Sequence, residues 1–312
     1  MLFARRYLVD DATGFIGGGG FGRVYRALDT NQNQVVALKL LRAGSGVSYA
    51  FREAQELTRL GGEFILRVHN ADVYQDVPYI ATELAAHGSA ADALIGTRGV
   101  PTDRAVMWTR HLLGGLIVCH AARPMLLHRD IKPANLFIRS DGHAQLGDFG
   151  VVETPDQHGY VPWAGSPRYL PPEAVTEGRM SIRSDIYGVG ITMWEILTGS
   201  SPFAAIPLPE LGAAIASGVG VRLYDVAPHV PTQLSRIVER AMNVDPDQRY
   251  ATAEEMDGAI GRLPLFKRVW AEEPTNDPRR AAMAKRRCRH AVRRHGAHDR
   301  TGGRGRDPST GW

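Results

Sequence analysis

The sequence predicts an α+β protein of two lobes, a small β-rich N-terminal lobe with one helix and a larger helical C-terminal lobe. Two observations carry this prediction. Strand-like segments dominate as far as about residue 84, and long apolar helices dominate after it. The 312 residues, 44% of them hydrophobic, provide ample core for one large domain or two small ones. Two such lobes predict a ligand-binding crevice between them.

The individual elements follow from the spacing of apolar side chains. Alternating or apolar stretches predict strands, the second of them opening with a glycine turn, at residues 6–11, 14–28, 34–41, 64–74 and 77–84. One amphipathic helix is predicted at residues 48–60. After residue 84, apolar runs with helix-start or glycine stop signals predict helices at residues 102–122, 184–199, 231–243 and 252–263.

The charge is divided unevenly along the chain. Residues 266–312 carry 13 Lys and Arg against 5 Asp and Glu, whereas the other 265 residues carry 24 against 28. This C-terminal stretch is rich in Arg, His and Gly and poor in large apolar residues, so a disordered tail is expected. We therefore predict a folded domain over 6–265, with lobes of about 6–84 and 88–265, and a tail over 266–312. Alternatively, the tail forms a basic amphipathic helix that contacts an acidic membrane surface or nucleic acid.

Compartment signals are few. The two cysteines, Cys119 and Cys288, exclude a disulfide framework and fit a reducing compartment. No run approaches the length of a transmembrane segment, and the N-terminus lacks the apolar stretch and cleavage site of a secretory signal. A cytoplasmic protein is the expectation.

A glycine-rich loop lies near the N-terminus. Gly17, Gly19 and Gly22 have the spacing G-x-G-x-x-G, which is a weak signal alone because dinucleotide-binding folds and plain turns share it. A dinucleotide site needs a helix after the glycines, whereas residues 23–28 read as a strand. Glycines between two strands let backbone N–H groups approach a polyphosphate. A flexible hairpin without ligand is the alternative.

Lys39 lies in an otherwise apolar strand, where an ammonium is costly unless it meets an anion or faces solvent. The following helix offers Glu53, with Glu56 as the competing partner. A Lys39–Glu53 pair would keep the ammonium charged and directed at phosphates.

The stretch "HRDIKPANLF" gathers Asp130, Lys132 and Asn135 within six residues. Three polar groups held close together on one loop by apolar flanks suggest a functional site. A polar turn before a strand is the structural alternative.

These features together resemble the eukaryotic-type serine/threonine protein kinases, in particular their bacterial, actinobacterial-like branch. "HRDIKPANLF" is similar to the catalytic loop and "LGDFG" to the metal-binding turn, while "GSPRYLPPE" resembles the end of the activation segment. "SDIYGVGITMWEILTG" resembles the central helix of the large lobe and "DPDQRY" the late arginine motif. The motifs occur in the family's order over nearly all of residues 6–264.

The resemblance implies a role for each group. Asp130 would accept the proton of the attacking hydroxyl and Lys132 would steady the γ-phosphoryl group, with Lys39 and Glu53 forming the phosphate-directing pair. Asn135 and Asp148 would hold Mg²⁺, or Mn²⁺ in its place. ATP would be bound by the glycine loop, the adjoining strands and the hinge after Thr82, through Ile16, Gly17, Gly19, Gly22, Val24, Ala37, Lys39, Glu83 and Ala85.

The resemblance also implies regulatory and structural residues. Arg129 marks kinases whose activation segment, here Asp148–Glu173, is ordered by a phosphate. Thr154 is the predicted phosphorylation site, with an unmodified loop residue as the alternative, and Ser166 aligns with the threonine that contacts the catalytic aspartate. Glu173 and Arg249 should form a buried ion pair, and Asp185 should anchor the catalytic loop.

Lys132 and "GSPRYLPPE" follow the serine/threonine pattern, so Ser and Thr hydroxyls of proteins are the expected acceptors. The resemblance further implies autophosphorylation through self-association, and a signalling role. A pseudokinase-like nucleotide-binding scaffold is the alternative, although all the reacting groups are present. A small-molecule phosphotransferase would lack the "PPE" segment and the late arginine.

Overall fold

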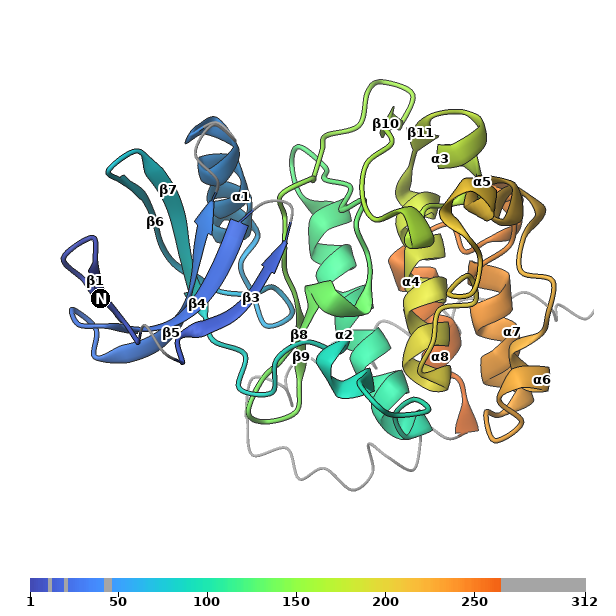
Figure 1. Cartoon of the computed structure of the whole chain (residues 1–312). Helices are drawn as coiled ribbons and strands as arrows, with labels where there is room; N and C mark the ends of the chain where they lie inside the picture. Colours follow the sequence, from blue (N-terminus) through green and yellow to red (C-terminus); the bar gives the residue numbers. More distant parts are fainter. Residues whose placement is uncertain (11–12, 20–21, 42–46, 265–312) are drawn as a thin grey trace, which may run out of the picture. The chain divides into compact units, whose positions relative to one another are not determined.

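We describe the computed structural model over residues 1–10, 13–19, 22–41 and 47–264, with only the backbone of Gly19 and residues 47–53. The predicted tail lies outside these residues. The two-lobed α+β fold predicted from the sequence is confirmed: strands β1–β7 and helix α1 form one lobe and helices α2–α8 the other (Figure 1). No helix in the described part of the chain combines the length and apolarity that crossing a membrane requires.

The N-terminal lobe is an antiparallel sheet in the order β1-β2-β4-β5-β7-β6, with β3 paired to β4. Its elements are β1 (Leu2–Phe3), β2 (Tyr7–Val9), β3 (Phe15–Gly19), β4 (Gly22–Asp29), β5 (Gln34–Leu41), α1 (Val47–Leu60), β6 (Val68–Tyr74) and β7 (Val77–Glu83). Helix α1 packs on the sheet through Ala54, which meets Leu41 of β5 and Ile80 of β7. Because strands alternate, the residues opposite this face form a second small core around Tyr7, Leu38 and Tyr79.

The strand predicted at residues 64–74 begins only at Val68. Ile65 and Leu66 instead pair with Leu146 of the other lobe, where the amide of Leu66 donates to the carbonyl of Leu146 (2.9 Å). The first part of this apolar stretch therefore joins the two lobes.

The C-terminal lobe is built around two long apolar helices, α2 and α4, which share one large core. Its helices are α2 (Thr102–Ala121), α3 (Pro172–Thr176), α4 (Ile182–Thr198), α5 (Leu208–Ser217), α6 (Leu223–Val226), α7 (Thr232–Ala241) and α8 (Ala253–Gly261). Short 3₁₀ turns are η1 (Asp92–Leu94), η2 (Pro133–Asn135), η3 (Pro167–Tyr169) and η4 (Pro246–Gln248), and short strands are β8 (Leu136–Ile138), β9 (Ala144–Leu146), β10 (Val161–Pro162) and β11 (Arg179–Met180).

Helix α4 is defined at both ends by its sequence. Ser181 and Ser184 form a reciprocal capping box at the N-terminus, and Gly199 ends the helix with a left-handed backbone (φ 81°). Gly199 is the helix stop that the sequence predicts. The capping box places Asp185 in the first turn, directly beneath the loop of residues 128–135.

Candidate functional site

One carboxylate fixes the loop of residues 128–135 from below. The almost fully buried Asp185 accepts from the main-chain amides of His128 (2.9 Å) and Arg129 (2.8 Å). Burial alone raises the pKa of Asp185, but the imidazole of His120 at 2.9 Å and the amide of Arg129 outweigh it and lower the pKa. An ionised Asp185 thus holds the loop, and Arg129 takes a left-handed backbone there (φ 67°).

The three polar groups of the loop meet around Asp130. The ammonium of Lys132 donates to Asp130 Oδ2 (2.6 Å) and to the hydroxyl of Ser166 (2.7 Å). The amide of Ser166 donates to Asp130 Oδ1 (2.8 Å), and Asn135 Nδ2 donates to Asp130 Oδ2 (3.1 Å) and to the Asp130 carbonyl (2.8 Å). Asp130, Lys132, Asn135 and Ser166 therefore form a single hydrogen-bonded cluster.

The charge state of Asp130 follows from this cluster. Its side chain is only 7% exposed, and burial alone raises its pKa. The bonds from Lys132 and Ser166 outweigh that effect, so the pKa of Asp130 lies below its ordinary value. Asp130 is therefore an ionised acceptor at neutral pH, and a hydroxyl group within reach can donate to it.

Asp148 follows β9 and turns toward the other lobe. Its carboxylate pairs with the ammonium of Lys39 from β5 (3.0 Å), and both side chains are partly exposed. Asp148 has a left-handed backbone (φ 58°), which is uncommon for a residue other than glycine. The turn thus brings a carboxylate from one lobe to a lysine from the other.

The next residue, Phe149, is buried and locks this turn. Its ring lies edge-on to the ring of His128, with 4.9 Å between centroids, and His128 Nε2 lies 3.1 Å from the carbonyl of Gly147. Burial lowers the pKa of His128, so the neutral imidazole donates to that carbonyl. A Cβ on Gly147 would lie 2.8 Å from the ring of Phe137, which explains the small residue before the turn.

The glycines lie on two paired strands, as expected from the sequence. Strands β3 and β4 pair antiparallel, with Gly17 opposite Val24 and Gly19 opposite Gly22. A strand, β4, follows the glycines where a dinucleotide-binding turn has a helix, so the two arrangements differ.

Two of these glycines have different reasons to be small. A Cβ on Gly22 would collide with the main-chain carbonyl of Leu40 in β5, so strand packing requires glycine there. A Cβ on Gly17 would meet nothing within 4 Å, and the neighbouring Ile16 is exposed. Gly17 therefore leaves open backbone beside the sheet, where a phosphate chain could approach.

The remaining nucleotide-binding candidates lie on adjacent strands. Lys39 is in register with Val24 on one side, and Ala37 is in register with Thr82 of β7. Glu83 ends β7, and Ala85 lies in the connection to the C-terminal lobe. Val24, Ala37 and Lys39 therefore lie on paired strands, and Glu83 and Ala85 lie where the sheet leads into the C-terminal lobe.

The predicted partner of Lys39 lies on α1. The backbone of Glu53 is helical, but its side chain is outside the described part of the structure. Glu56, the competing partner, forms an ion pair with Arg59 at 2.6 Å on the same helix.

Asn135 and Asp148 offer the hard oxygen ligands that Mg²⁺ prefers. The amide of Gly147 donates to the carbonyl of Asn135 (3.0 Å), which ties the loop of residues 128–135 to the turn that carries Asp148. Because Asn135 Nδ2 is directed at Asp130, its Oδ1 is the atom left for a cation. The donor set therefore fits a divalent cation held between the two segments.

The stretch Asp148–Glu173, predicted to be the activation segment, is tied to the loop of residues 128–135 at several points. Arg129 donates to the main-chain carbonyls of Val151 (2.5 Å) and Pro162 (2.9 Å). Thr154, the predicted phosphorylation site, is exposed, whereas Ser166 is engaged by Asp130 and Lys132.

A second ionic site is closed to solvent. Arg249 donates twice to Glu173, at 2.8 Å and 2.7 Å, and its side chain is fully buried. Ser184 also donates to Glu173 (2.7 Å). This pair joins α3 to the stretch after η4.

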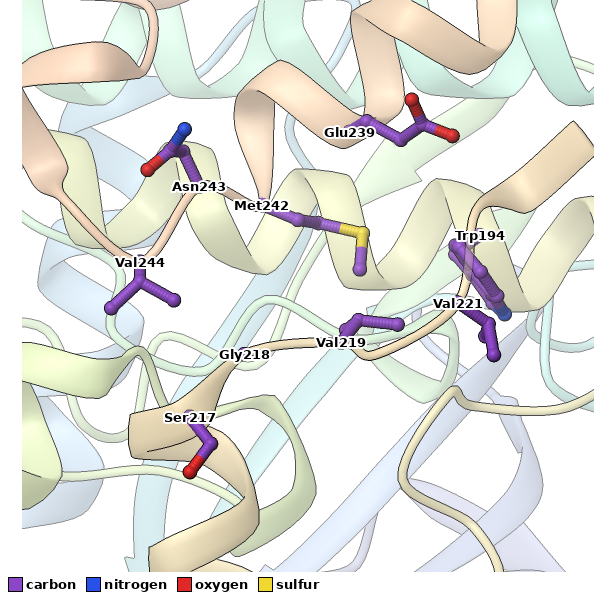
Figure 2. Close-up of a pocket in the computed structure, with 9 residues that line it drawn as sticks. All are labelled: Trp194, Ser217, Gly218, Val219, Val221, Glu239, Met242, Asn243 and Val244. Carbon is purple, nitrogen blue, oxygen red and sulfur yellow. The ribbon is translucent and has the colours of Figure 1, made fainter.

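Sequence reasoning missed His120, the imidazole partner of Asp185. Nothing in its local spacing marks it, because it is one polar residue at the end of an apolar helix. A pocket of about 260 Å³ was also not anticipated; Figure 2 shows it between the end of α5, the turn that follows, and the end of α7. It is lined by Trp194, Ser217, Gly218, Val219, Val221, Glu239, Met242, Asn243 and Val244, which include none of the predicted site residues.

Comparison with known proteins agrees with this geometry. The model of the protein kinase domain family matches residues 11–258. The serine/threonine-protein kinase PknL of Mycobacterium tuberculosis is 33% identical over 300 residues, which cover 92% of this chain and 74% of that protein. PknE of the same species is 30% identical over 253 residues (78% and 44%), and PrkC of Bacillus subtilis is 31% identical over 259 residues (78% and 39%).

Proposed function

Because this chain belongs to the protein kinase family, as a serine/threonine kinase of the bacterial eukaryotic-type branch, we propose that it phosphorylates proteins with ATP. The γ-phosphoryl group is transferred to Ser and Thr hydroxyls, with Mg²⁺ as the metal ion. The observation that carries the proposal is the cluster of Asp130, Lys132 and Asn135 beside Asp148 and Lys39. Phosphoryl transfer needs an acceptor for the hydroxyl, cations for the phosphate groups and oxygen ligands for a metal ion, and this cluster offers all three.

Asp130 acts on the incoming hydroxyl. Its depressed pKa keeps the carboxylate ionised, so it accepts the hydrogen bond of the acceptor Ser or Thr and orients its oxygen for attack. The amide of Ser166 and the amide group of Asn135 hold the carboxylate in one orientation. Positioning of this kind is the main contribution that protein groups make to phosphoryl transfer.

Lys132 and Lys39 act on the phosphate groups. Lys132 donates to Asp130 and Ser166, which places its ammonium beside the hydroxyl acceptor, where the transferred phosphoryl group arrives. Lys39, on the strand next to the glycine hairpin, can exchange its contact with Asp148 for phosphate oxygens of ATP. When bound at Asn135 and Asp148, the metal ion would neutralise phosphate charge.

Autophosphorylation, through transient self-association, and a signalling role complete the proposal. An exposed Thr154 on the activation segment supports a hydroxyl that a second copy of the chain can reach. If the reaction occurs between copies, its initial rate per molecule rises with protein concentration.

Intact-mass measurement after incubation with ATP tests the proposal. The chain is first treated with phosphatase, then incubated with Mg²⁺, with Mn²⁺ or with EDTA, beside a Lys39→Ala variant. We expect phosphate increments, on the chain or on a generic basic protein, for the wild type with a divalent cation only. Absence of transfer with every cation, while ATP still binds, would favour the nucleotide-binding scaffold.

A further inference from the structure

The activation segment is held to Arg129 by two main-chain carbonyls and one carboxylate. The guanidinium binds the start of the segment at the carbonyl of Val151 (2.5 Å) and its later part at the carbonyl of Pro162 (2.9 Å). The carboxylate of Glu153 lies 3.7 Å from Arg129 Nη2 and supplies a full negative charge. One side chain of the catalytic loop thus joins two parts of the segment that lie about ten residues apart in sequence.

The burial of Arg129 makes this anion important. Its side chain is only 9% exposed, whereas that of Glu153 is 35% exposed. A guanidinium so far removed from water needs a compensating negative charge, which main-chain carbonyls supply only in part. Glu153 provides that charge from inside the segment.

The main chain holds Glu153 in this place. Its carbonyl accepts from the amide of Leu127 (2.9 Å), and its own amide donates to the carbonyl of Leu127 (3.2 Å). Leu127 lies two residues before Arg129, so this bridge fixes both the carboxylate and the guanidinium to the same short stretch. Farther along, β10 pairs with β11, with Val161 opposite Met180.

The hydroxyl-bearing side chains of the segment make contacts other than the contact with Arg129 that Glu153 makes. Ser166 is engaged with Asp130 and Lys132, and the ring of Tyr160 lies 4.0 Å from the guanidinium carbon of Arg179. Pro162, whose carbonyl Arg129 binds, has no hydroxyl to phosphorylate. Thr154 directly follows Glu153, so a phosphate there would add negative charge beside an existing carboxylate.

We propose that Glu153 is the anion that positions Arg129 and the activation segment, so that the kinase is active without phosphorylation of that segment. Glu153 acts through Arg129 and is a positioning residue. The proposal rests on the proposed function, because it assigns the regulation of the same catalytic loop. In the folded chain, the carboxylate of Glu153 takes the ordering role that the sequence predicts for a phosphate on Thr154, and this carboxylate is always present.

The test compares wild type, Glu153→Gln, Glu153→Asp, Thr154→Ala and the control Glu255→Gln, all treated with phosphatase and checked by intact mass. Glu255 pairs with Arg240 at 2.8 Å and is 40% exposed. The control substitution therefore removes an acid of similar exposure outside the segment. Initial rates of phosphorylation of a basic protein give kcat and KM for ATP. Hydrogen–deuterium exchange is measured on peptides that cover residues 149–163.

We expect Glu153→Gln to lower kcat ~3- to 10-fold at nearly unchanged KM for ATP, the loss expected for a partly exposed ion pair. Exchange in residues 149–163 should rise most in Glu153→Gln, and Glu153→Asp should show a smaller loss of kcat and a smaller rise in exchange. Thr154→Ala and Glu255→Gln should match the unphosphorylated wild type within ~2-fold, the size of effect expected away from the contact.

Two results would overturn the proposal. One is a wild type that is inactive after phosphatase treatment and gains activity only when the segment is phosphorylated. The other is a Glu153→Gln segment that exchanges no faster than that of Glu255→Gln. Faster exchange in Glu153→Gln, with no transfer by any form of the chain, would instead support the anchoring role and refute the proposed kinase activity.

Discussion

Two regions of this protein hold a carboxylate against a cation, and they differ in what remains open to solvent. In the catalytic loop, Lys132 and Asp130 are 21% and 7% exposed. Between α3 and the stretch after η4, Arg249 and Glu173 are 0% and 8% exposed. The two pairs have similar distances, 2.6 Å and 2.7 Å, so distance alone does not separate the pair proposed to act in the reaction from the structural pair.

The difference lies in how the remaining hydrogen-bonding capacity is used. Arg249 also donates to the carbonyls of Arg183, Asn243 and Val244, so protein groups surround its guanidinium. Lys132 has three hydrogens and, among the described residues, donates to Asp130 and Ser166. A partly exposed ammonium can donate to a phosphoryl oxygen as a further partner, whereas a fully enclosed guanidinium can only hold segments together.

Substituting Asp130 should give the largest effect and tests the open pair. Asp130→Asn keeps the shape and the acceptor for Ser166 but removes the charge that orients the hydroxyl, so transfer should fall by ~10²- to 10⁴-fold. The thermal midpoint should change far less than in an Arg249 variant. Initial rates and melting curves are measured beside Asp76→Asn, an exposed carboxylate in the N-terminal lobe. Near wild-type transfer by Asp130→Asn would remove Asp130 from the reaction.

Substituting Arg249 tests the closed pair. Arg249→Met leaves the buried Glu173 without its cation, so the free energy of unfolding should fall by ~3–5 kcal/mol. The control is Arg222→Met, which breaks an exposed pair with Asp225 (74% and 49% exposed) and should change the free energy of unfolding far less. Urea unfolding measures both. Equal losses in the two variants would show that enclosure is not what makes the buried pair matter.

The sequence was sufficient to predict which groups share a site where those groups lie close together along the chain. Asp130, Lys132 and Asn135 are within six residues, so a short loop has to bring them near one another. The motif resemblance placed Asp148 and Lys39 in the same site, although 109 residues separate them. Glycine positions also carried information, since Gly199 ends α4 as expected.

Contacts set by packing alone could not be predicted. His120 meets Asp185 across 65 residues, and no spacing rule links a helix end to a second helix start. The sequence directed attention to Thr154 beside Arg129, whereas the charge that faces Arg129 comes from Glu153, one residue earlier. The strand expected from residue 64 was shortened because Ile65 and Leu66 pair with Leu146.

The pair of Arg6 and Asp29 is neither as open as Lys132–Asp130 nor as enclosed as Arg249–Glu173. Its removal should cause the smallest loss of stability among these substitutions. Asp29 is fully buried, but Arg6 remains 21% exposed, with bonds of 2.9 Å and 2.7 Å between them. The bonds from Arg6 outweigh burial and lower the pKa of Asp29. Asp29→Asn should therefore reduce the free energy of unfolding at pH 7 by ~1 kcal/mol, less than Arg249→Met.

The pH dependence of this loss follows from the direction of the pKa shift. A carboxylate whose pKa is lower in the folded than in the unfolded chain stabilises the fold above its ordinary pKa of about 3.9. That contribution disappears as the pH falls through the lower folded pKa. Urea unfolding of wild type and Asp29→Asn between pH 7 and pH 3 should thus give a constant difference down to about pH 4.5, and a shrinking one below. A difference that grew on acidification would mean that Arg6 does not stabilise the ionised carboxylate.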